Sequence, residues 1–282
     1  MRRTLPFTKM HGAGNDFVLL DGIRNELPPI APLASQLCDR RFGIGADQLL
    51  VVRPSRAADF RMEIYNADGS QVEMCANGIR AFYKFLRDRG HTDADEIRVE
   101  TLSGVVRPSW AGRDRVKVDM GPPVLAPAKI PTTLGSGDGP VLDVLLDVGG
   151  DALAVSAVSM GNPHAVIFVE DPDRIPVERL GPIIEHHPAF PNRVNVEFVT
   201  PVGRGRIRQR TWERGTGETL ACGSGACAVA VVSILRGLVD NQVTIELRGG
   251  DLEISWQGGE SSVYMTGPAA EVFSGEFPIG EG

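Results

Sequence analysis

The sequence predicts an α/β protein of the α+β type, with two pseudo-symmetric domains that arose by internal duplication. The main observation is that residue patterns return after a fixed interval, as Cys75 and Cys222 do (222 − 75 = 147). The second is that each copy contains short β-like runs on both sides of an apolar helical segment. At 282 residues the chain is also long enough for two domains of ordinary size, each burying its own core.

The repeat extends over most of the chain. A Gly-Asn pair before an apolar run occurs twice, and polar residues and cysteines follow at the same interval of 147. Beyond the cysteines the interval becomes 146, which a single deletion explains. The matches at 147 are Gly14-Asn15 with Gly161-Asn162, Gln48 with Asn195, Tyr65-Asn66 with Trp212-Glu213 and Cys75 with Cys222; those at 146 are Glu100 with Glu246, Ser109-Trp110 with Ser255-Trp256 and Gly121-Pro122 with Gly267-Pro268.

Residue types and the positions of turn-forming residues predict the strands and helices in order along the chain. In the first copy they predict strands over 17–20, 48–52, 60–65, 97–101 and 115–120. A weaker helical pattern covers 34–40. Each repeated cysteine precedes an apolar helix rich in small residues, expected over 76–87 and 224–236, and Gly90 and Gly237 mark the ends of these helices.

The boundary between the halves is predicted in a turn-rich stretch. Residues 122–140 contain five prolines and close with Gly135-Ser136-Gly137-Asp138-Gly139. The strand after Gly267-Pro268 can cross back to the first domain. We therefore predict an N-terminal half made of residues 1–121 together with 266–282, and a C-terminal half made of residues 122–265.

Composition excludes several classes of function. Lys+Arg 29 against Asp+Glu 36 gives a net charge of −7, and no basic run offers a footprint for nucleic acid. No stretch approaches the roughly 20 apolar residues of a membrane span. The start, Met1 to Pro6, lacks the apolar core of a secretory signal. We expect a cytoplasmic protein without nucleic-acid or membrane partners.

The residues that would hold a metal or a cofactor are missing from the sequence pattern. Four cysteines and five histidines form no CxxC or HExxH motif, so we expect no metal site. None of the four lysines lies in a Gly-rich segment, whereas a pyridoxal-phosphate enzyme needs a Schiff-base lysine and a phosphate cradle. We therefore expect no cofactor.

The two repeated cysteines are the strongest functional signal. Cys75 and Cys222 each stand immediately before a predicted helix, where the positive end of the helix dipole favours a thiolate. The first amides of such a helix also bind a carboxylate or phosphate. The alternative is that both are buried structural cysteines, which we consider the better interpretation of Cys38 and Cys227 because neither is part of the repeat.

Two thiols on either side of a bound anion fit a two-base epimerisation next to a carboxylate. One thiolate removes the α-proton from one face, and the opposite thiol delivers a proton to the other face. The carbanion-like state needs donors aimed at its carboxylate, which paired helix N-termini supply without a cofactor.

Other repeated or neighbouring polar residues predict a lined cleft, although each asparagine alone is more typical of a turn. Arg214 can bind a carboxylate and Glu213 can accept an ammonium group, so a second amino-acid head group fits there. His164 and Glu213 are candidates for adjusting the pKa of the thiols. The candidate binding residues are Asn15, Gln48, Asn66, Asn162, Asn195, Glu213 and Arg214.

Taken together, these motifs resemble the diaminopimelate epimerase family from about Lys9 to Gly267. The resemblance rests on His11 to Phe17, Asn66 to Ser70, Glu73 to Gly78, Gly161 to His164, Trp212 to Gly215 and Ala221 to Ala228. It implies interconversion of LL- and meso-2,6-diaminopimelate for lysine and cell-wall synthesis, without pyridoxal phosphate or metal. It further implies two domains, each a mixed, mostly antiparallel sheet wrapped around a central helix, with the active site in the cleft between them, in a homodimer.

The same resemblance implies the role of individual residues. Cys75 and Cys222 would be the acid/base pair, and the reacting carboxylate would bind at the amides of Ala76, Asn77, Gly223 and Ser224. The sequence departs from the family at Ala76, where glycine is more common, but alanine keeps the amide N–H.

Three alternatives stay open at this point. A proline or hydroxyproline racemase shares the two-thiol arrangement but does not need Glu213 and Arg214 for a second head group. A thiol redox protein would join Cys75 and Cys222 in a reversible disulfide. A non-catalytic amino-acid-binding module would bind the substrate without exchanging its α-proton.

Overall fold

The computed structural model describes residues 3–279. The chain forms two compact units: the first extends to Val118 and includes the segment from Gly267 onwards, and the second is Asp119–Thr266. The predicted N-terminal half also contains residues 1–2 and 280–282, which lie outside the described residues.

The first unit contains one mixed sheet, an antiparallel strand pair outside that sheet (Pro108–Trp110 with Arg115–Asp119) and two helices. Its elements are β1 (Arg3–Gly12), β2 (Asn15–Asp21), α1 (Ile30–Cys38), β3 (Gln48–Arg53), β4 (Phe60–Asn66), β5 (Gln71–Val72), α2 (Ala76–Asp88), β6 (Val99–Thr101), β7 (Gly104–Val106), β8 (Pro108–Trp110), β9 (Arg115–Asp119) and β19 (Ala270–Ile279). The sheet order is β19-β1-β2-β3-β4-β6-β7, with β5 beside β4. Only β2–β3 and β4–β6 run parallel among these pairs, and a helix makes each parallel crossover.

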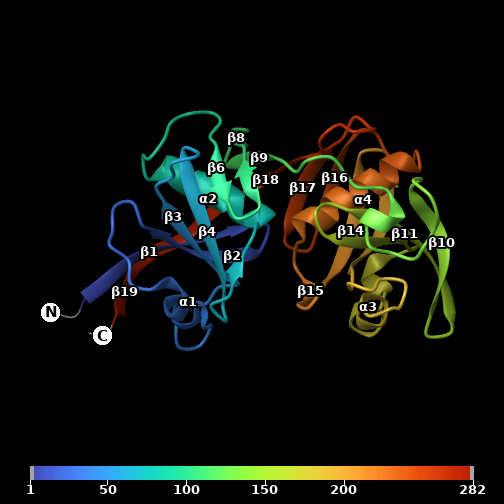
Figure 1. The fold of residues 1–282 in the computed structure, drawn as a ribbon, viewed down its shortest axis with the longest axis horizontal. Helices are drawn as coiled ribbons and strands as arrows, with labels where there is room; N and C mark the ends of the chain where they lie inside the picture. Colours follow the sequence, from blue (N-terminus) through green and yellow to red (C-terminus); the bar gives the residue numbers. More distant parts are fainter. Residues whose placement is uncertain (1–2, 280–282) are drawn as a thin grey trace. The chain divides into compact units, whose positions relative to one another are not determined.

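The second unit repeats this plan (Figure 1). Its elements are η1 (Pro127–Lys129), β10 (Val141–Val148), β11 (Asp151–Ser159), β12 (Pro163–Phe168), η2 (Pro172–Arg174), α3 (Val177–Glu185), β13 (Asn195–Gly203), β14 (Arg206–Glu213), β15 (Gly217–Thr219), α4 (Gly223–Leu235), β16 (Gln242–Leu247), β17 (Gly250–Ser255) and β18 (Tyr264–Pro268). Its strands follow the order β10-β11-β12-β13-β14-β16-β17-β18, with β15 beside β14.

Strand register shows that the duplication is structural. Phe17 is opposite Gln48 in the parallel pair β2–β3, and His164 is opposite Asn195 in the parallel pair β12–β13. Each residue of the second pair lies 147 positions after its counterpart in the first pair (164 − 17 = 147 and 195 − 48 = 147). The helices α1 and α2 correspond in the same way to α3 and α4, so the two-copy fold predicted from the repeat is confirmed.

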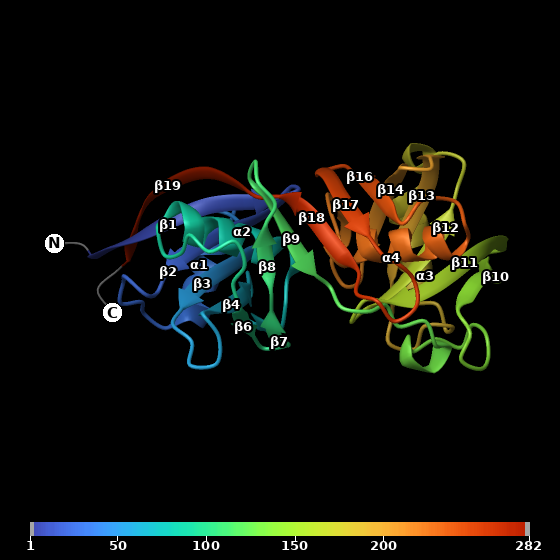
Figure 2. The same cartoon turned by 90° about the horizontal axis from the view of Figure 1, so that it is seen from above.

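The two sheets differ in where along the chain their outer strand comes from. In the second unit β10 pairs with β11, the next strand in sequence (Figure 2). In the first unit the equivalent place beside β1 is taken by β19, near the end of the chain, with Arg3 opposite Ile279. The C-terminal strand therefore completes the first sheet.

Each sheet is covered by helices on both faces, which explains its nearly continuous apolar strands. Leu49 and Val51 of β3 share a core cluster with Leu33 and Leu37 of α1. Helix α4 is apolar on every side and contacts β11, β12, β13, β16 and β17. A helix of this kind is stable only inside a protein. In the described part of the chain, no helix combines the length and the apolar character needed to cross a membrane.

The predicted elements differ from the structure mainly at their ends. The weak helix expected over 34–40 is α1, which begins at Ile30 and ends before Asp39, whose carboxylate accepts the amides of Arg41 and Phe42. The strand expected over 97–101 starts only at Val99. The turn-rich 122–140 contains η1 and a bridge from Val124 to Ser159.

Candidate active site

Cys75 caps the N-terminus of α2. Its backbone is extended (φ −136°, ψ 114°), and its Sγ accepts the amide of Gly78 at 3.3 Å. The thiol therefore stands where serine or aspartate usually caps a helix. The side chain is half-buried.

Cys222 repeats this geometry at the start of α4. Its backbone angles are φ −116° and ψ 112°, and its Sγ accepts the amide of Gly225 at 3.4 Å. Ser224 adds a hydroxyl 3.5 Å from the same sulfur. Only 5% of Cys222 is exposed. The predicted placement of both thiols at helix starts is confirmed.

Asn15 lies beside Cys75 because a tight turn joins β1 to β2. Ala13 and Gly14 both have positive φ, of 54° and 84°, as a two-residue hairpin turn requires. The Asn15 Oδ1 lies 3.7 Å from Cys75 Sγ and accepts from Asn77 Nδ2 at 3.3 Å. Its Nδ2 donates to Asp47 at 2.7 Å, which fixes the orientation of the amide.

A network of charges supports Asp47 and Asn15. Arg40 donates to Asp47 at 2.7 Å and to Asp16 at 2.8 Å, and Lys9 donates to Asp16 at 2.6 Å. Burial opposes the charge of Asp16, but the hydrogen bonds from Arg40 and Lys9 outweigh it and hold the pKa of this carboxyl well below its usual range. Asp16 is therefore charged at neutral pH.

Gln48 and Asn66 meet across an antiparallel strand pair. The register places Gln48 opposite Asn66, and Gln48 Nε2 donates to Asn66 Oδ1 at 3.0 Å. Asn66 Nδ2 in turn donates to Ser70 at 3.1 Å. The first unit thus brings together Cys75, Asn15 and Asn77 as one group, and Gln48 with Asn66 as a second.

His164 is buried in the second unit between two acceptors. Its Nδ1 lies 2.7 Å from Glu197 Oε1, and its Nε2 lies 3.0 Å from Asn162 Oδ1. Neither His164 nor Glu197 has exposed surface. Glu197 also approaches α4, because a Cβ at Gly225 would lie 2.6 Å from Glu197 Oε1. His164 thus contacts Asn162 directly and reaches α4 through Glu197.

Asn195 holds the turn that carries Arg214. Asn195 Nδ2 donates to the carbonyl of Pro163 at 3.0 Å, and its Oδ1 accepts the amide of Arg214 at 2.9 Å. Arg214 Nη1 donates to the carbonyl of Asn192 at 3.0 Å. The Arg214 guanidinium is thereby attached to the loop that precedes β13, the strand that begins at Asn195.

Glu213 is a partly buried carboxyl next to Cys222. Burial raises its pKa, and Thr219 Oγ1 donates to it at 2.5 Å. Burial also raises the pKa of the Cys222 thiol well above its usual value, and the charges of Glu213 and Glu197 raise it further. At Cys222, burial and the two carboxyls therefore oppose the thiolate that the helix amides favour.

Sequence reasoning missed several residues that hold the site. Arg80, Asp47, Glu197 and Thr219 all contact predicted site residues. Two of them had a usable signal: Asp47 directly precedes Gln48, and Glu197 follows Asn195 at the spacing that places both on one face of a strand. The burial of Arg80 carries no signal in the sequence.

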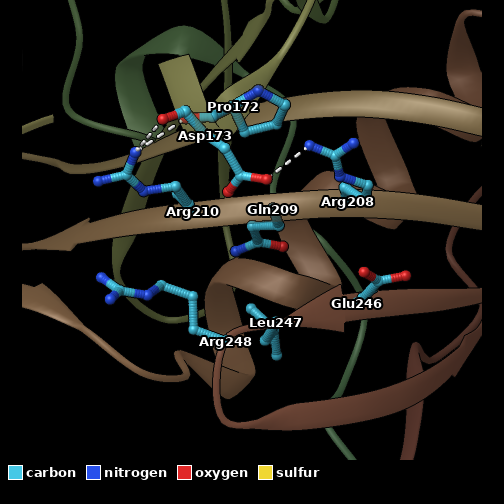
Figure 3. A pocket seen from close by; sticks show the side chains of 8 residues that line it. All are labelled: Pro172, Asp173, Arg208, Gln209, Arg210, Glu246, Leu247 and Arg248. Atoms are coloured by element: carbon cyan, nitrogen blue, oxygen red, sulfur yellow. Dashed lines mark hydrogen bonds and ion pairs between the residues drawn. The ribbon is translucent and has the colours of Figure 1, made fainter. Parts of the chain in front are cut away.

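A pocket elsewhere in the second unit is lined by none of the predicted site residues (Figure 3). Its arginines are already paired: Arg208 with Asp173 at 2.8 Å, and Arg210 and Arg248 with Glu218 at 2.8 and 3.1 Å. These pairs neutralise the cations that would otherwise attract an anion. The pocket is therefore a poor candidate for the site.

Comparison with known proteins gives a consistent result. The family model "Diaminopimelate epimerase" matches residues 7–126 and 156–272. The diaminopimelate epimerase of Moorella thermoacetica is 50% identical over 278 residues, covering 97% of this chain and 99% of the relative. That of Pelotomaculum thermopropionicum is 51% identical over 278 residues, covering 96% and 98%.

Solved structures extend the likeness of fold to more distant proteins. A Bacillus anthracis phenazine biosynthesis protein of the PhzF family has a TM-score of 0.71 at 18% identity, covering 98% of this chain and 100% of the other. A hydroxyproline epimerase from Agrobacterium vitis has a TM-score of 0.67 at 19% identity, covering 100% and 95%. At such identities only the fold is shared. The identity of about half over nearly the whole chain shows that the protein belongs to the diaminopimelate epimerase family, whose members are isomerases.

Proposed function

We propose that the protein interconverts LL- and meso-2,6-diaminopimelate by a two-base reaction at the α-carbon, with Cys75 and Cys222 as the acid/base pair and without a cofactor. One thiolate takes the α-proton, and the other thiol gives a proton to the opposite face, so the centre inverts. Protons and charge balance between the two sulfurs. The next turnover in the same direction requires the thiol and thiolate to exchange a proton through solvent.

One observation carries this proposal: in both copies of the fold a cysteine caps a 13-residue helix and its sulfur accepts the third amide of that helix. Helix N-termini bind carboxylates through their amides and their positive dipole end. In the proposed reaction the amides of Ala76, Asn77, Gly223 and Ser224 bind the reacting carboxylate and stabilise the charge that develops on it.

The protonation of Cys222 fits one of the two roles. Burial and the neighbouring carboxyls raise its pKa, so the resting protein holds it as a thiol able to donate a proton. Glu213 and, through Glu197, His164 adjust this pKa in the proposed mechanism. Both act from within the second unit.

The second head group of the substrate requires its own partners. In our proposal Arg214 binds the distal carboxylate, because a guanidinium makes bidentate hydrogen bonds to a carboxylate. Glu213 contributes to binding of an ammonium group. The remaining binding residues we propose are Asn15, Gln48, Asn66, Asn162 and Asn195. Each already lies in a hydrogen-bonded group of its unit.

The test is proton exchange. The reduced protein is incubated with LL-diaminopimelate in deuterated water, with no added cofactor, and deuterium entry at the α-carbon is followed beside formation of the meso isomer. Cys75→Ala and Cys222→Ala are run in parallel, with Cys38→Ala as the matched control. We expect exchange with inversion in the wild type and the control, and loss of inversion in either catalytic variant.

Three outcomes would overturn the proposal. Inversion of proline instead of diaminopimelate would indicate a racemase of a different substrate class. Activity that disappears under strong reductant would indicate a redox protein. Binding without exchange, while both thiols are titratable, would indicate a binding module.

We further propose that the protein acts as a cytoplasmic homodimer. Sedimentation of the purified protein at several concentrations tests the dimer, because a monomer would sediment near the 30.3 kDa of one chain. Fractionation of cells that express the protein tests its location.

A further inference from the structure

We propose that Arg80 is a positioning residue for Cys75, holding the first turn of α2 and the Asn77 amide in place and setting a positive charge beneath the thiol-bearing end of the helix. This inference rests on the function proposed above. It concerns the first unit alone, so every contact that carries it lies within one compact part of the chain.

The guanidinium of Arg80 is fully buried and makes three directed contacts. Its Nη2 donates to Asn77 Oδ1 at 2.9 Å, its Nη1 to the carbonyl of Ala76 at 3.2 Å and its Nε to the carbonyl of Pro268 at 3.2 Å. The planar fork thus joins the two residues that follow Cys75 to the returning C-terminal segment. A lysine could not make these contacts at once.

The surrounding backbone is fitted closely to this group. A Cβ added to Gly12 would lie 3.1 Å from Arg80 Nη2 and 3.1 Å from the Asn77 carbonyl. The end of β1 therefore packs directly on the Arg80–Asn77 contact, and only a residue without a side chain leaves the guanidinium where it is.

Arg80 also determines which way the neighbouring amides point. Because its N–H groups require the Asn77 oxygen, the Asn77 nitrogen faces Asn15 and donates to Asn15 Oδ1 at 3.3 Å. Asp47 fixes Asn15 from the other side at 2.7 Å. The oxygen of Asn15 is thereby directed at Cys75 Sγ, 3.7 Å away.

The second copy shows that the fold alone does not need this cation. The position equivalent to Arg80 is Cys227 (227 − 80 = 147), which is fully buried in α4. A buried charge is costly compared with a well-packed apolar residue. The arginine therefore has a use in the first copy that the second copy lacks.

The charged groups near the two thiols are opposite in sign. Beside Cys222 lie the carboxyls of Glu213 and Glu197, which disfavour a thiolate. In the first turn of α2 the Arg80 guanidinium bonds the Ala76 carbonyl and Asn77 Oδ1, and in our proposal its charge favours a thiolate at Cys75. The two helix starts share their backbone geometry but differ in the sign of the charged groups held beside them.

The test measures the thiol directly. The unliganded protein is treated with iodoacetamide over a range of pH, and modification of the Cys75 peptide is quantified by mass spectrometry. We expect Arg80→Gln to raise the pH midpoint of Cys75 alkylation by about one unit, because the cation that favours the thiolate is gone. Arg80→Lys should leave the midpoint near that of the wild type.

Two controls accompany this test. Lys84→Met removes a positive charge one turn further along α2, where Lys84 pairs with Asp88 at 2.9 Å and Asp114 at 2.7 Å. It should not move the Cys75 midpoint. Cys222, measured in the same digests, should keep its own midpoint in every variant.

A second variant keeps the proposal testable if Arg80→Gln does not fold. Gly12→Ala retains the charge but shifts the guanidinium against Asn77, so like Arg80→Lys it should lower kcat while the Cys75 midpoint stays near that of the wild type. An unchanged midpoint in folded Arg80→Gln, an unchanged kcat in folded Gly12→Ala, or an equal midpoint shift in Lys84→Met would overturn the positioning role.

Activity gives a separate readout. In Arg80→Lys we expect kcat for epimerisation to fall about tenfold while the alkylation midpoint stays in place, since position is lost and charge is kept. If the wild type does not epimerise at all, the proposed function fails while the alkylation result still decides the role of Arg80.

Discussion

At the scale of single residues, the site contains ionisable groups whose pKa values the fold shifts away from their usual values. Glu213 is a carboxyl whose burial raises its pKa, beside a thiol whose pKa is also raised. Such pairs are typical of sites where protonation has a function, because structure alone is better served by apolar residues. The cost to stability and the benefit to activity are separately measurable.

Replacing Glu213 by Gln should stabilise the protein and reduce its activity. With a folded pKa above the unfolded one, the carboxyl destabilises the fold at about neutral pH, and the penalty fades as the pH falls towards about 4. We expect Tm to rise by a few degrees at about pH 7.5 with little gain near about pH 4, and kcat to fall at least about tenfold. Calorimetry and epimerisation assays at both pH values measure this; a lower Tm at neutral pH would contradict it.

Asp16 should have the opposite dependence on pH. Hydrogen bonds from Arg40 and Lys9 hold its pKa below the usual value, so the stabilisation is present above about pH 4 and is lost as the pH falls further. Asp16→Asn should cost about 2 kcal/mol of unfolding free energy at about pH 7 and somewhat less at about pH 3, because the folded-state pKa lies well below that pH and most of the loss comes at still lower pH. Urea unfolding gives both values, with the exposed Asp138→Asn as control; a difference that is independent of pH would refute this account.

At the scale of elements, the two cysteine-capped helices are alike in backbone but not in surroundings. A Cβ at Gly225 would lie 2.6 Å from Glu197 Oε1, whereas at Gly78 the nearest atom would be Cys75 Cβ at 3.2 Å. Both glycines are in the first turn of their helix, where alanine is otherwise favourable.

This difference predicts unequal effects of the same substitution. Gly225→Ala must displace a buried carboxylate and should cost about 2 kcal/mol and most of the activity. Gly78→Ala should stay within about 1 kcal/mol of the wild type, since small shifts relieve its contact and helix propensity partly compensates. Thermal unfolding and kcat of the two variants side by side decide this; equal losses would show that the contact with Glu197 is unimportant.

At the scale of the whole molecule, the two units have the same strand arrangement although their outer strands are connected differently along the chain. β19 stands beside β1 as β10 stands beside β11, although β19 is distant in sequence from its partner. Because the strands are antiparallel and Arg3 is opposite Ile279, a short linker between the ends of the chain would convert β19–β1 into a hairpin like β10–β11.

A circular permutant tests this view. Joining the ends through a Gly-Ser linker and opening the chain at the exposed Gly137 makes the first unit continuous in sequence and moves residues 119–137 of the second unit to the new C-terminus. We expect wild-type circular dichroism and kcat within about threefold of the wild type, since no core contact is cut. A control opened at Gly161, in the hairpin between β11 and β12, should lose activity. Failure of the first permutant to fold would show that the order of the chain is essential.

The sequence alone determined the features that depend on neighbouring residues or on a repeat. The two copies, the helices that follow Cys75 and Cys222 and the capping position of each thiol all follow from local patterns at a constant interval. Caps and helix periodicity are properties of a few consecutive residues, so a single sequence suffices to predict them.

Only the tertiary structure decided the features that depend on burial and on contacts between distant residues. The register in which β19 pairs with β1, the raised pKa of Cys222 beside Glu197 and the contact of Arg80 with Pro268 each depend on segments far apart in the chain. The charge state of a thiol is set by the solvent it loses and the charges brought near it, and neither is fixed until the chain has folded.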